Sequence, residues 1–357
     1  MHSLSAVWLC FIAFAAVFTS GCGGDKTRPL PPETTLTFAF DGLSDHSIHR
    51  LHQFDNLLFA ATDKGLFIKS TATQSSWQAA GLETAELLDL IVFSKDHYLA
   101  LTQSTVAEKA VYRLMETTTG GGHWYPVEPD FGGGESEPIV AIVYDSHNQR
   151  LFAKGIAVLA VSYDEGRSWH KIAGQWQGAG ASRGVIKYNT RTNEVWYGGQ
   201  NTVGQTLLCT YALDNDDERC FTQALANPGS IYDIAFDTHN PARILVAGAG
   251  GVAQSLDQGE TWVTLIAEQP HRLYTAVAVD RQNPDIIYTG GWDNLWQAPQ
   301  PLTLEISRDG GVSWTQFLYP STSLFGGIKS LLAVNENGRN ILYIGLHKGG
   351  VVKAILP

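Results

Sequence analysis

The sequence predicts an all-β protein made of repeated small sheets, and three observations support this prediction. Three octapeptides, at residues 162–169, 255–262 and 307–314, share the pattern S-x-D-x-G-x-[ST]-W. Together with fainter copies, they recur every 41 to 52 residues. The chain also has 36 glycines and only 17% charged residues, which fits a turn-rich β protein. Repeats of this length match the four-stranded blade of a β-propeller, a ring of sheets that bury their faces against their neighbours.

Each octapeptide has the residue types of a tight β-hairpin turn. The Asp can accept hydrogen bonds from backbone amides across the turn, the Gly takes a positive φ, and the Trp packs between neighbouring sheets. We therefore expect these residues to be structural rather than catalytic or metal-binding. They are Ser162, Asp164, Gly166 and Trp169; Ser255, Asp257, Gly259 and Trp262; and Ser307, Asp309, Gly311 and Trp314.

Fainter copies of the octapeptide extend the repeat to six units. Residues 70–77 keep the first Ser and the final Trp, and residues 117–124 keep the Gly and the Trp, with Thr119 in place of the Asp. Residues 214–221 keep the Asp and replace the Trp with Phe221. The last positions of the six copies are therefore residues 77, 124, 169, 221, 262 and 314.

The segments within each unit follow one order. An alternating segment at 231–237 predicts an inner strand, Asn240-Pro241 predicts a turn, and 244–248 predicts a second strand that ends in Gly. The same order returns in residues 139–152, 186–197, 276–288 and 331–345.

The last unit lacks a strand. It has candidate strands at 331–334, 341–346 and 351–356, and then the sequence stops. Residues 35–40 alternate apolar with polar side chains and belong to no other unit, so they can supply the missing outer strand. Closing the ring in this way removes an open sheet edge. We predict seven blades over residues 34–357, with six or eight as alternatives because boundaries drift in such an analysis.

The octapeptides resemble Asp-box (BNR) repeats. The chain from residue 34 resembles the sialidase-like, photosystem II assembly factor-like and sortilin-like propellers that carry such repeats. The resemblance implies the fold but no single function, because these propellers include hydrolases, sorting-receptor ectodomains and assembly factors.

The N-terminal residues predict export. An apolar run at 4–19 is too short for a comfortable membrane span and is followed by small residues, so 1–21 has the outline of a signal peptide. Ser20-Gly21-Cys22 resembles a bacterial lipobox, which implies an acylated Cys22 and a lipidated tether at 22–33.

Details of this segment indicate where the exported protein is located and which alternatives to lipidation remain. Gly23, rather than Asp, follows Cys22, which implies the outer membrane. His2 is the only candidate for the usual Lys or Arg near the start, and Thr19 replaces the usual Leu. A secreted protein and an uncleaved anchor are therefore the alternatives.

The remaining cysteines agree with export. Cys209 and Cys220 flank the predicted hairpin turn at 214–218, at positions that would face each other across two strands. A disulfide between them requires an oxidising compartment. The alternative is a pair of buried free thiols.

Composition argues against several partners. The net charge of −11 repels phosphate backbones, so no nucleic-acid binding is expected. The 11 histidines never take HExxH spacing and no CxxC pair exists, so no metal or other cofactor is predicted. We expect a monomer that meets the membrane only through its lipid.

A candidate binding face follows from the expected topology, because the Asp-box turns occupy the opposite face. Aromatic side chains beside isolated charges could grip a protein loop or stack on a sugar. The alternative is that the tryptophans of the insertion at 290–304 only pack it onto blade six. The candidate residues are Trp176, Arg183, His271, Arg272, Trp292, Asp293, Trp296, Tyr319, His347 and Lys348.

The functional hypothesis is a non-catalytic, lipid-anchored propeller that acts as a protein-binding scaffold or assembly factor in the cell envelope. The alternative is a carbohydrate-binding protein or a divergent glycoside hydrolase that acts on polysaccharide. The arginine cluster of sialidases has no recognisable counterpart here, since its Arg-Ile-Pro element is absent. Hydrolysis would need two carboxyl groups about 5 to 9.5 Å apart in an open groove.

Overall fold

The fold is taken from a computed structural model. It describes residues 36–73, 75–132, 137–175, 184–201, 204–221, 224, 229–293, 298–319, 321, 323–336 and 338–356. The chain from residue 35 onward forms one compact unit, and all its described regular elements are β-strands. The predicted signal peptide and Cys22 lie outside the described residues. No helix of the described residues is long and apolar enough to cross a membrane.

The strands form seven antiparallel sheets of four, which confirms the predicted all-β propeller of seven blades. Blade one contains β2 (Ile48–Phe54), β3 (Leu57–Thr62), β4 (Gly65–Ser70) and β5 (Gln78–Ala79). Blade two contains β6 (Glu86–Val92), β7 (Tyr98–Val106), β8 (Lys109–Thr117) and β9 (Tyr125–Val127). Blade three contains β10 (Ala141–Asp145), β11 (Arg150–Lys154), β12 (Val158–Ser162) and β13 (His170–Gly174).

The remaining blades repeat this order. Blade four contains β14 (Gly184–Asn189), β15 (Glu194–Gln200), β16 (Thr206–Ala212) and β17 (Asp217–Cys220). Blade five contains β18 (Ile231–Phe236), β19 (Ile244–Gly248), β20 (Gly251–Ser255) and β21 (Val263–Ala267). Blade six contains β22 (Arg272–Val279), β23 (Ile287–Asp293), β24 (Leu302–Ser307) and β25 (Thr315–Tyr319). Blade seven contains β26 (Ile328–Glu336), β27 (Arg339–Leu346), β28 (Val351–Ile355) and β1 (Thr37–Gly42).

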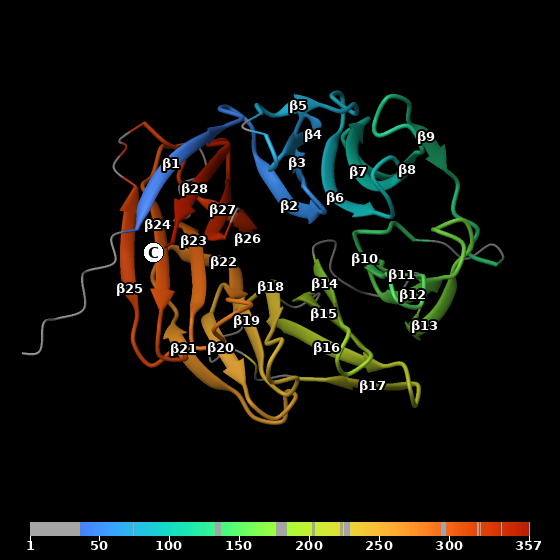
Figure 1. Cartoon of the computed structure of the whole chain (residues 1–357). Coiled ribbons are helices and arrows are strands. Elements are labelled where there is room, and N and C mark those ends of the chain that lie inside the picture. The colour runs from blue at the N-terminus through green and yellow to red at the C-terminus, as the bar shows by residue number, and fades with distance from the viewer. Residues whose placement is uncertain are drawn as a thin grey trace, which may run out of the picture. The chain divides into compact units, whose positions relative to one another are not determined.

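The innermost strands of the seven blades are β2, β6, β10, β14, β18, β22 and β26, which face the centre of the ring (Figure 1). Each inner strand contacts the inner strands of both neighbouring blades, so the ring is continuous. The hydrophobic clusters lie between adjacent blades: in one of them, Leu99 and Leu114 of blade two pack against Leu151 and Trp169 of blade three. Burial between sheets therefore holds the ring together.

The strand near the N-terminus closes the ring, as predicted. β1 pairs with β28 in antiparallel register, with Phe38 opposite Ala354. The closure is fastened by Asp41, whose side chain is only 6% exposed. Its carboxylate lies 2.7 Å from Lys69 Nζ of blade one and 2.9 Å from Lys353 Nζ of blade seven. It also accepts a 3.1 Å hydrogen bond from Nε1 of Trp77, so one carboxylate joins the first blade to the last.

The three clear Asp-box turns share one hydrogen-bond network. In the first, Ser162 Oγ donates to Asp164 Oδ1 at 2.8 Å and accepts from Gly166 N at 2.8 Å. Asp164 Oδ1 also accepts from Ser168 N at 2.8 Å, and Trp169 Nε1 donates to Gly166 O at 2.9 Å. The turns at 255–262 and 307–314 repeat these bonds. The turn therefore fixes the indole that packs between blades.

The fainter turn of blade two shows how a Thr substitutes for the Asp. Thr119 Oγ1 accepts a 2.9 Å hydrogen bond from His123 N, the amide equivalent to Ser168 N in blade three. Thr117 Oγ1 accepts from Gly121 N at 3.1 Å, as the first Ser does elsewhere. A hydroxyl thus replaces one of the carboxylate bonds, and the turn keeps its shape without a charge.

Acid should weaken the Asp-box turn of blade six. Hydrogen bonds from the hydroxyl and amide of Ser313 and from Ser307 lower the pKa of Asp309 to about 2 from 3.8. A carboxyl whose pKa is depressed by folding stabilises the folded state above its unfolded pKa, and this contribution is lost as pH falls through its folded pKa. We expect Asp309→Ala to destabilise the protein at neutral pH and the difference from the native protein to shrink between about pH 4 and about pH 2. Urea unfolding across this range tests it, and a difference that stays constant with pH would contradict it.

The structure contains the disulfide predicted between Cys209 and Cys220. The two residues are direct register partners of β16 and β17, the third and fourth strands of blade four. The bond therefore fastens the outermost strand of this blade, where the turn carries Phe221 instead of Trp.

Candidate functional site

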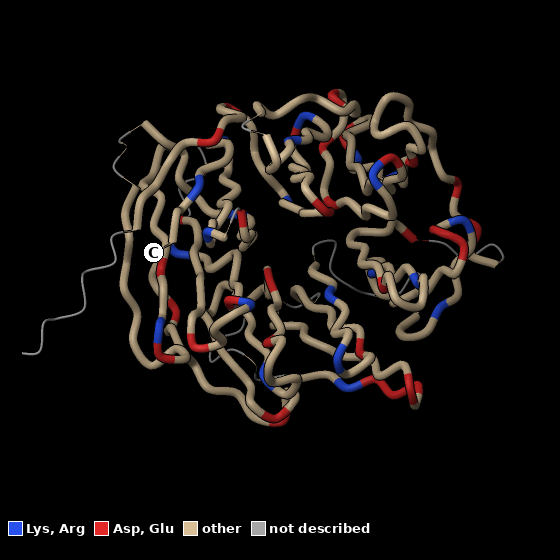
Figure 2. Tube along the Cα trace, in the orientation of Figure 1, with Lys and Arg blue, Asp and Glu red and all other residues tan. Residues whose placement is uncertain are grey.

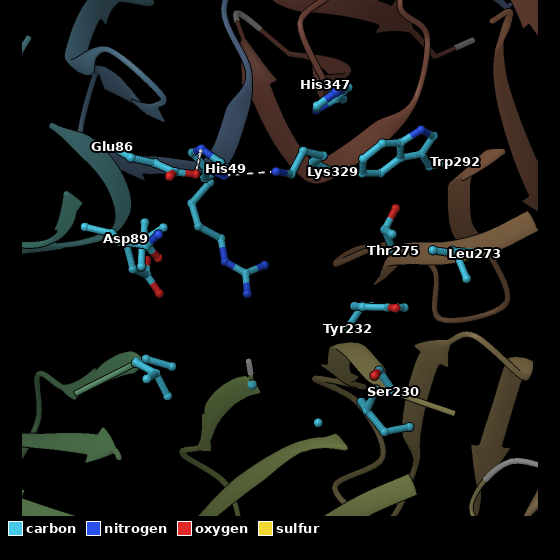
Figure 3. A pocket seen from close by; sticks show the side chains of 18 of the residues that line it. His49, Glu86, Asp89, Ser230, Tyr232, Leu273, Thr275, Trp292, Lys329 and His347 are labelled. Atoms are coloured by element: carbon cyan, nitrogen blue, oxygen red, sulfur yellow. Dashed lines mark hydrogen bonds and ion pairs between the residues drawn. The ribbon is translucent and has the colours of Figure 1, made fainter. Parts of the chain in front are cut away.

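A cavity of about 620 Å³ lies at the centre of the ring, on the side where the inner strands begin. All seven blades contribute to its wall, and Figure 3 shows the side chains that converge there. One lining residue from each blade in turn is His49, Glu86, Val140, Gly184, Ile231, Leu273 and Lys329. The site therefore depends on the closed ring, because no single blade forms it.

β-bulges aim side chains into this cavity. Five inner strands, β2, β6, β18, β22 and β26, have a register shift near their first residues that leaves one residue without a partner on the second strand. Such a bulge bends the strand and redirects the side chain of the extra residue. The five extra residues, all in the cavity wall, are His49, Leu88, Tyr232, Thr275 and Lys329.

The residue after a bulge ties neighbouring blades together. Asp233 Oδ2 of blade five accepts a 3.2 Å hydrogen bond from Val277 N of blade six. Ser330 Oγ of blade seven accepts a 3.1 Å hydrogen bond from Leu51 N of blade one, at the equivalent positions. These bonds give partners to backbone amides of the innermost strands and join neighbouring blades at the cavity wall.

Three side chains from three blades form a polar chain at the cavity. Lys329 Nζ lies 3.0 Å from His49 Nδ1, and His49 Nε2 lies 3.0 Å from Glu86 Oε1 (Figure 3). An ammonium group can only donate, so Nδ1 accepts and the proton of the neutral ring sits on Nε2, facing Glu86. Burial lowers the pKa of His49 below its usual value, and the nearby Lys329 lowers it further, against the opposing effect of Glu86. The imidazole is therefore neutral near pH 7.

A second set of charges crosses the channel deeper in the ring. Asp233 Oδ1 lies 3.1 Å from Lys187 Nζ and 3.8 Å from Arg50 Nη1, so a residue of blade one approaches blade five. Arg50 lines both the central cavity and a further cavity of about 380 Å³ along the inner strands. Positions of both acidic and basic residues lie along the strands near the centre of the ring (Figure 2).

One carboxyl group of the central cavity is unsuited to donate a proton near neutral pH. Asp89 lies 3.0 Å from His52 Nε2. Burial by itself raises the pKa of Asp89, but the hydrogen bond from His52 and the charges of His52 and Arg50 bring it below its usual value. A general acid for glycoside hydrolysis needs a raised pKa, so Asp89 does not fit that role.

Two of the residues predicted from the sequence lie together in the cavity wall. The rings of Trp292 and His347 stack with centroids 4.4 Å apart and planes 23° apart. Trp292 is only 6% exposed, and a side chain at Gly327 would place a Cβ 2.9 Å from its ring. Trp292, in β23 of blade six, therefore packs against residues next to the strands of blade seven.

The other predicted residues are spread around this region. Arg272 Nη1 pairs with Asp293 Oδ1 at 3.3 Å beside the cavity, and His271 precedes β22. Lys348 Nζ lies 5.9 Å from the ring centroid of Phe325. Tyr319 contacts Phe38 of β1, away from the cavity, with centroids 5.7 Å apart. Three predicted residues lie outside those described: Trp176, Arg183 and Trp296.

Sequence reasoning missed the inner-strand residues of the cavity because it considered only loops. A signal was present in the repeated phrases Ile48-His49-Arg50-Leu51, Ile231-Tyr232-Asp233-Ile234 and Ile328-Lys329-Ser330-Leu331. In each, two residues interrupt a buried aliphatic pattern at the start of the inner strand, which is compatible with a bulge.

Among the residues that the structure describes, two clusters have metal-ligand residue types, and neither favours a metal ion. In the first, Cys209 and Cys220 are joined by the disulfide and offer no thiolate beside Glu218. In the second, which contains His97, Glu116 and Glu165, the guanidinium of Arg167 donates to both oxygens of Glu116, at 2.9 and 2.8 Å. In both clusters, bonds within the protein already explain why these side chains lie close together.

The fold is shared with solved propellers of different functions. The structure is similar to a GH74 xyloglucanase from Xanthomonas campestris, with a TM-score of 0.65, 15% identity, and 89% of this chain and 53% of that one covered. It is also similar to YCF48 bound to a D1 peptide, with a TM-score of 0.65, 13% identity and coverage of 92% and 97%. A third is the extracellular domain of a putative hybrid two-component system from B. thetaiotaomicron, with a TM-score of 0.64, 12% identity and coverage of 90% and 39%.

The chain thus spans about half the length of the xyloglucanase and nearly all of YCF48. At these identities the likeness concerns the fold alone. No protein-family model matches the chain, and no curated protein matches it in sequence.

Proposed function

We propose that this protein binds an extended segment of a protein partner in the central cavity and acts as a non-catalytic scaffold or assembly factor. The observation that carries the proposal is the cavity of about 620 Å³ whose wall includes the bulged residues of five blades. Its wall combines an ammonium group, imidazoles, hydroxyls and aliphatic groups, a mixture that suits successive side chains of a peptide.

Similarity in fold supports this proposal. YCF48 is a propeller of nearly the same length, and its structure holds a D1 peptide. Lys329 and Tyr232 offer a cation and an aromatic ring, which can anchor a peptide, while Gly184 and Ala141 on other blades leave room for its backbone. The partner itself is expected to be a protein of the cell envelope.

Carbohydrate binding is the second candidate, favoured by the similarity to the xyloglucanase. The cavity is a less suitable sugar site, because one face of the Trp292 ring is covered by His347 and little of the ring is exposed. A sugar platform needs an accessible aromatic face. We therefore favour a peptide over a polysaccharide.

Filling the cavity tests the site. Ser230 lies in the cavity wall, and Ser230→Trp should reduce the binding of selected peptides at least tenfold because the indole occupies their volume. Val312→Trp is the matched control, since Val312 is 85% exposed in the Asp-box turn of blade six on the opposite face. Peptides selected from a random display library and a glycan array would be measured with both variants. Peptide binding unaffected by Ser230→Trp, or glycan binding abolished by it, would contradict the proposed site.

We also propose that the protein is exported and anchored by lipid on Cys22. The lipobox-like Ser20-Gly21-Cys22 and the disulfide between Cys209 and Cys220, which needs an oxidising compartment, support this proposal. Cys22→Ser should abolish incorporation of labelled fatty acid and release the protein from membranes, whereas Cys10→Ser should change neither. Labelling that persists in Cys22→Ser would exclude Cys22 as the lipid site.

A further inference from the structure

The strand that closes the ring enters the propeller on the face opposite to the cavity. β1 is the outer strand of blade seven and runs antiparallel to β28. Gly42, at the end of β1, pairs with Val351 at the start of β28, which follows His347 of the cavity wall. Thr37, at the start of β1, pairs with Ile355 at the other end of β28. The chain therefore enters blade seven away from the cavity and runs toward it.

The Asp-box turns lie on the face where β1 begins. In blade five, Ser255 at the end of β20 pairs with Ile244 at the start of β19, and Ile244 pairs with Phe236 at the end of the inner strand β18. Because the inner strands begin at the cavity, they end on the face that carries these turns. The start of β1 and the Asp-box turns thus share one face, and the cavity opens on the other.

The proposed lipid site is close to β1 in the sequence. The chain from Cys22 to Thr37 can span at most about 50 Å, since each extended residue adds about 3.3–3.6 Å. β1 has six residues and β26 has nine, so a blade is about 20–30 Å deep at about 3.3 Å per residue. With the cavity toward the bilayer, the tether would have to span this depth along the outside of the ring. That uses about half of its reach and restricts its conformations.

We propose that the lipid on Cys22 holds the Asp-box face toward the membrane, so that the central cavity opens away from the bilayer. This inference rests on the proposed anchor and peptide site, and it adds the direction from which the partner approaches. The mouth of the cavity then stands at least one blade depth, about 20–30 Å, from the bilayer surface. The partner segment is accordingly a tail or loop that projects from the membrane or belongs to a soluble protein.

Energy transfer to lipid acceptors tests the orientation. Leu256, in the Asp-box turn of blade five, and Val106, which follows Gln103 of the cavity wall along β7, are matched probe sites with side chains 58% and 55% exposed. A fluorescent amino acid would replace either residue in the lipidated protein, which is then inserted into preformed phosphatidylcholine vesicles containing rhodamine-labelled lipid. Transfer from position 256 should exceed transfer from position 106 at least about twofold, because the two faces lie about 20–30 Å apart. Equal transfer, or stronger transfer from position 106, would overturn the proposal.

Lengthening the tether tests whether it sets the orientation. About 20 Gly and Ser residues inserted after Glu33 would more than double the reach of the chain between Cys22 and Thr37. The difference in energy transfer between positions 256 and 106 should then shrink. A difference that stays as large as in the native protein would refute the role of the tether.

The direction of approach is tested with one peptide on two linkers. The best peptide from the display library would be attached to lipid of the same vesicles through about 5 or about 30 residues, which reach about 17 and about 100 Å. The native protein on these vesicles should bind the peptide on the short linker about tenfold or more weakly than on the long one. Cys22→Ser, which is free to turn its cavity toward the bilayer, should bind both alike. Equal binding of both linkers by the native protein would contradict the proposed direction.

The outcomes separate this inference from the proposals on which it rests. If no peptide binds in solution, the peptide site fails, while energy transfer still decides the orientation. If Cys22 carries no lipid, the anchor and this inference fail together. Peptide binding in solution, with equal energy transfer from the two probes of a lipidated protein, would overturn the orientation alone.

Discussion

Asp41→Ala is expected to lower the free energy of unfolding by about 3–5 kcal/mol, the usual cost of removing one partner of a buried ion pair. The side chain of Lys69, only 8% exposed, would keep its charge without its 2.7 Å partner. Lys353 and the Trp77 indole would lose the same acceptor. Because β1 closes the ring, the loss should also favour opening between blades one and seven. Urea unfolding followed by tryptophan fluorescence measures the change.

An exposed ion pair provides the control for Asp41. Glu260 pairs with Arg219 at 2.7 Å, but its side chain is largely exposed. Glu260→Ala should change stability by no more than about 1 kcal/mol, because surface ion pairs contribute little. Hydrogen exchange should show faster exchange in β1 and β28 of Asp41→Ala but not of Glu260→Ala. Equal effects of the two variants would refute the fastening role of Asp41.

Trp169→Ala is expected to cost about 3–5 kcal/mol, because a large aromatic side chain is removed from a packed core. Trp169 is 2% exposed and packs between blades two and three beside Leu99 and Leu114. Its indole also loses the 2.9 Å hydrogen bond to Gly166 O. Val312→Ala, on an exposed Asp-box position, should change stability by no more than about 0.5 kcal/mol.

Binding separates the structural role of Trp169 from a functional one. The indole is not among the residues of the central cavity, so Trp169→Ala should bind peptides normally under conditions where it remains folded. Loss of peptide binding in a folded Trp169→Ala protein would show that packing of the Asp-box indole affects the shape of the central cavity.

The fold was predictable because the same short sequence patterns, for a turn and for the strands beside it, recur along the chain. The turns with Ser162, Ser255 and Ser307 need particular side chains, and residues 35–40 had no other blade to join. The pairing of β1 with β28 confirms that assignment. The lack of a fourth strand at the C-terminal end was thus enough to predict how the ring closes.

The cavity was only partly predictable. Trp292 and His347 were identified from their place in loops, and both line it. The three members of the polar chain, His49, Glu86 and Lys329, were missed because each lies at the start of an inner strand, in a different blade. The 3.0 Å contact between Lys329 and His49 joins the last blade to the first, so only ring closure creates it. The 3.0 Å contact between His49 and Glu86 joins two consecutive blades.

The sequence by itself determined the repeat, the turn chemistry, the pairing of the two cysteines and the strand that completes the last blade. These features depend on local residue types and on alternation within short segments, which a chain shows in linear order. The tertiary structure alone decided which polar residues meet at the axis, that Trp292 is packed rather than displayed, and that Asp41 joins the first and last blades. Such contacts depend on β-bulges and on closure of the ring, and the spacing of residues along the sequence does not show which of them these two features bring together.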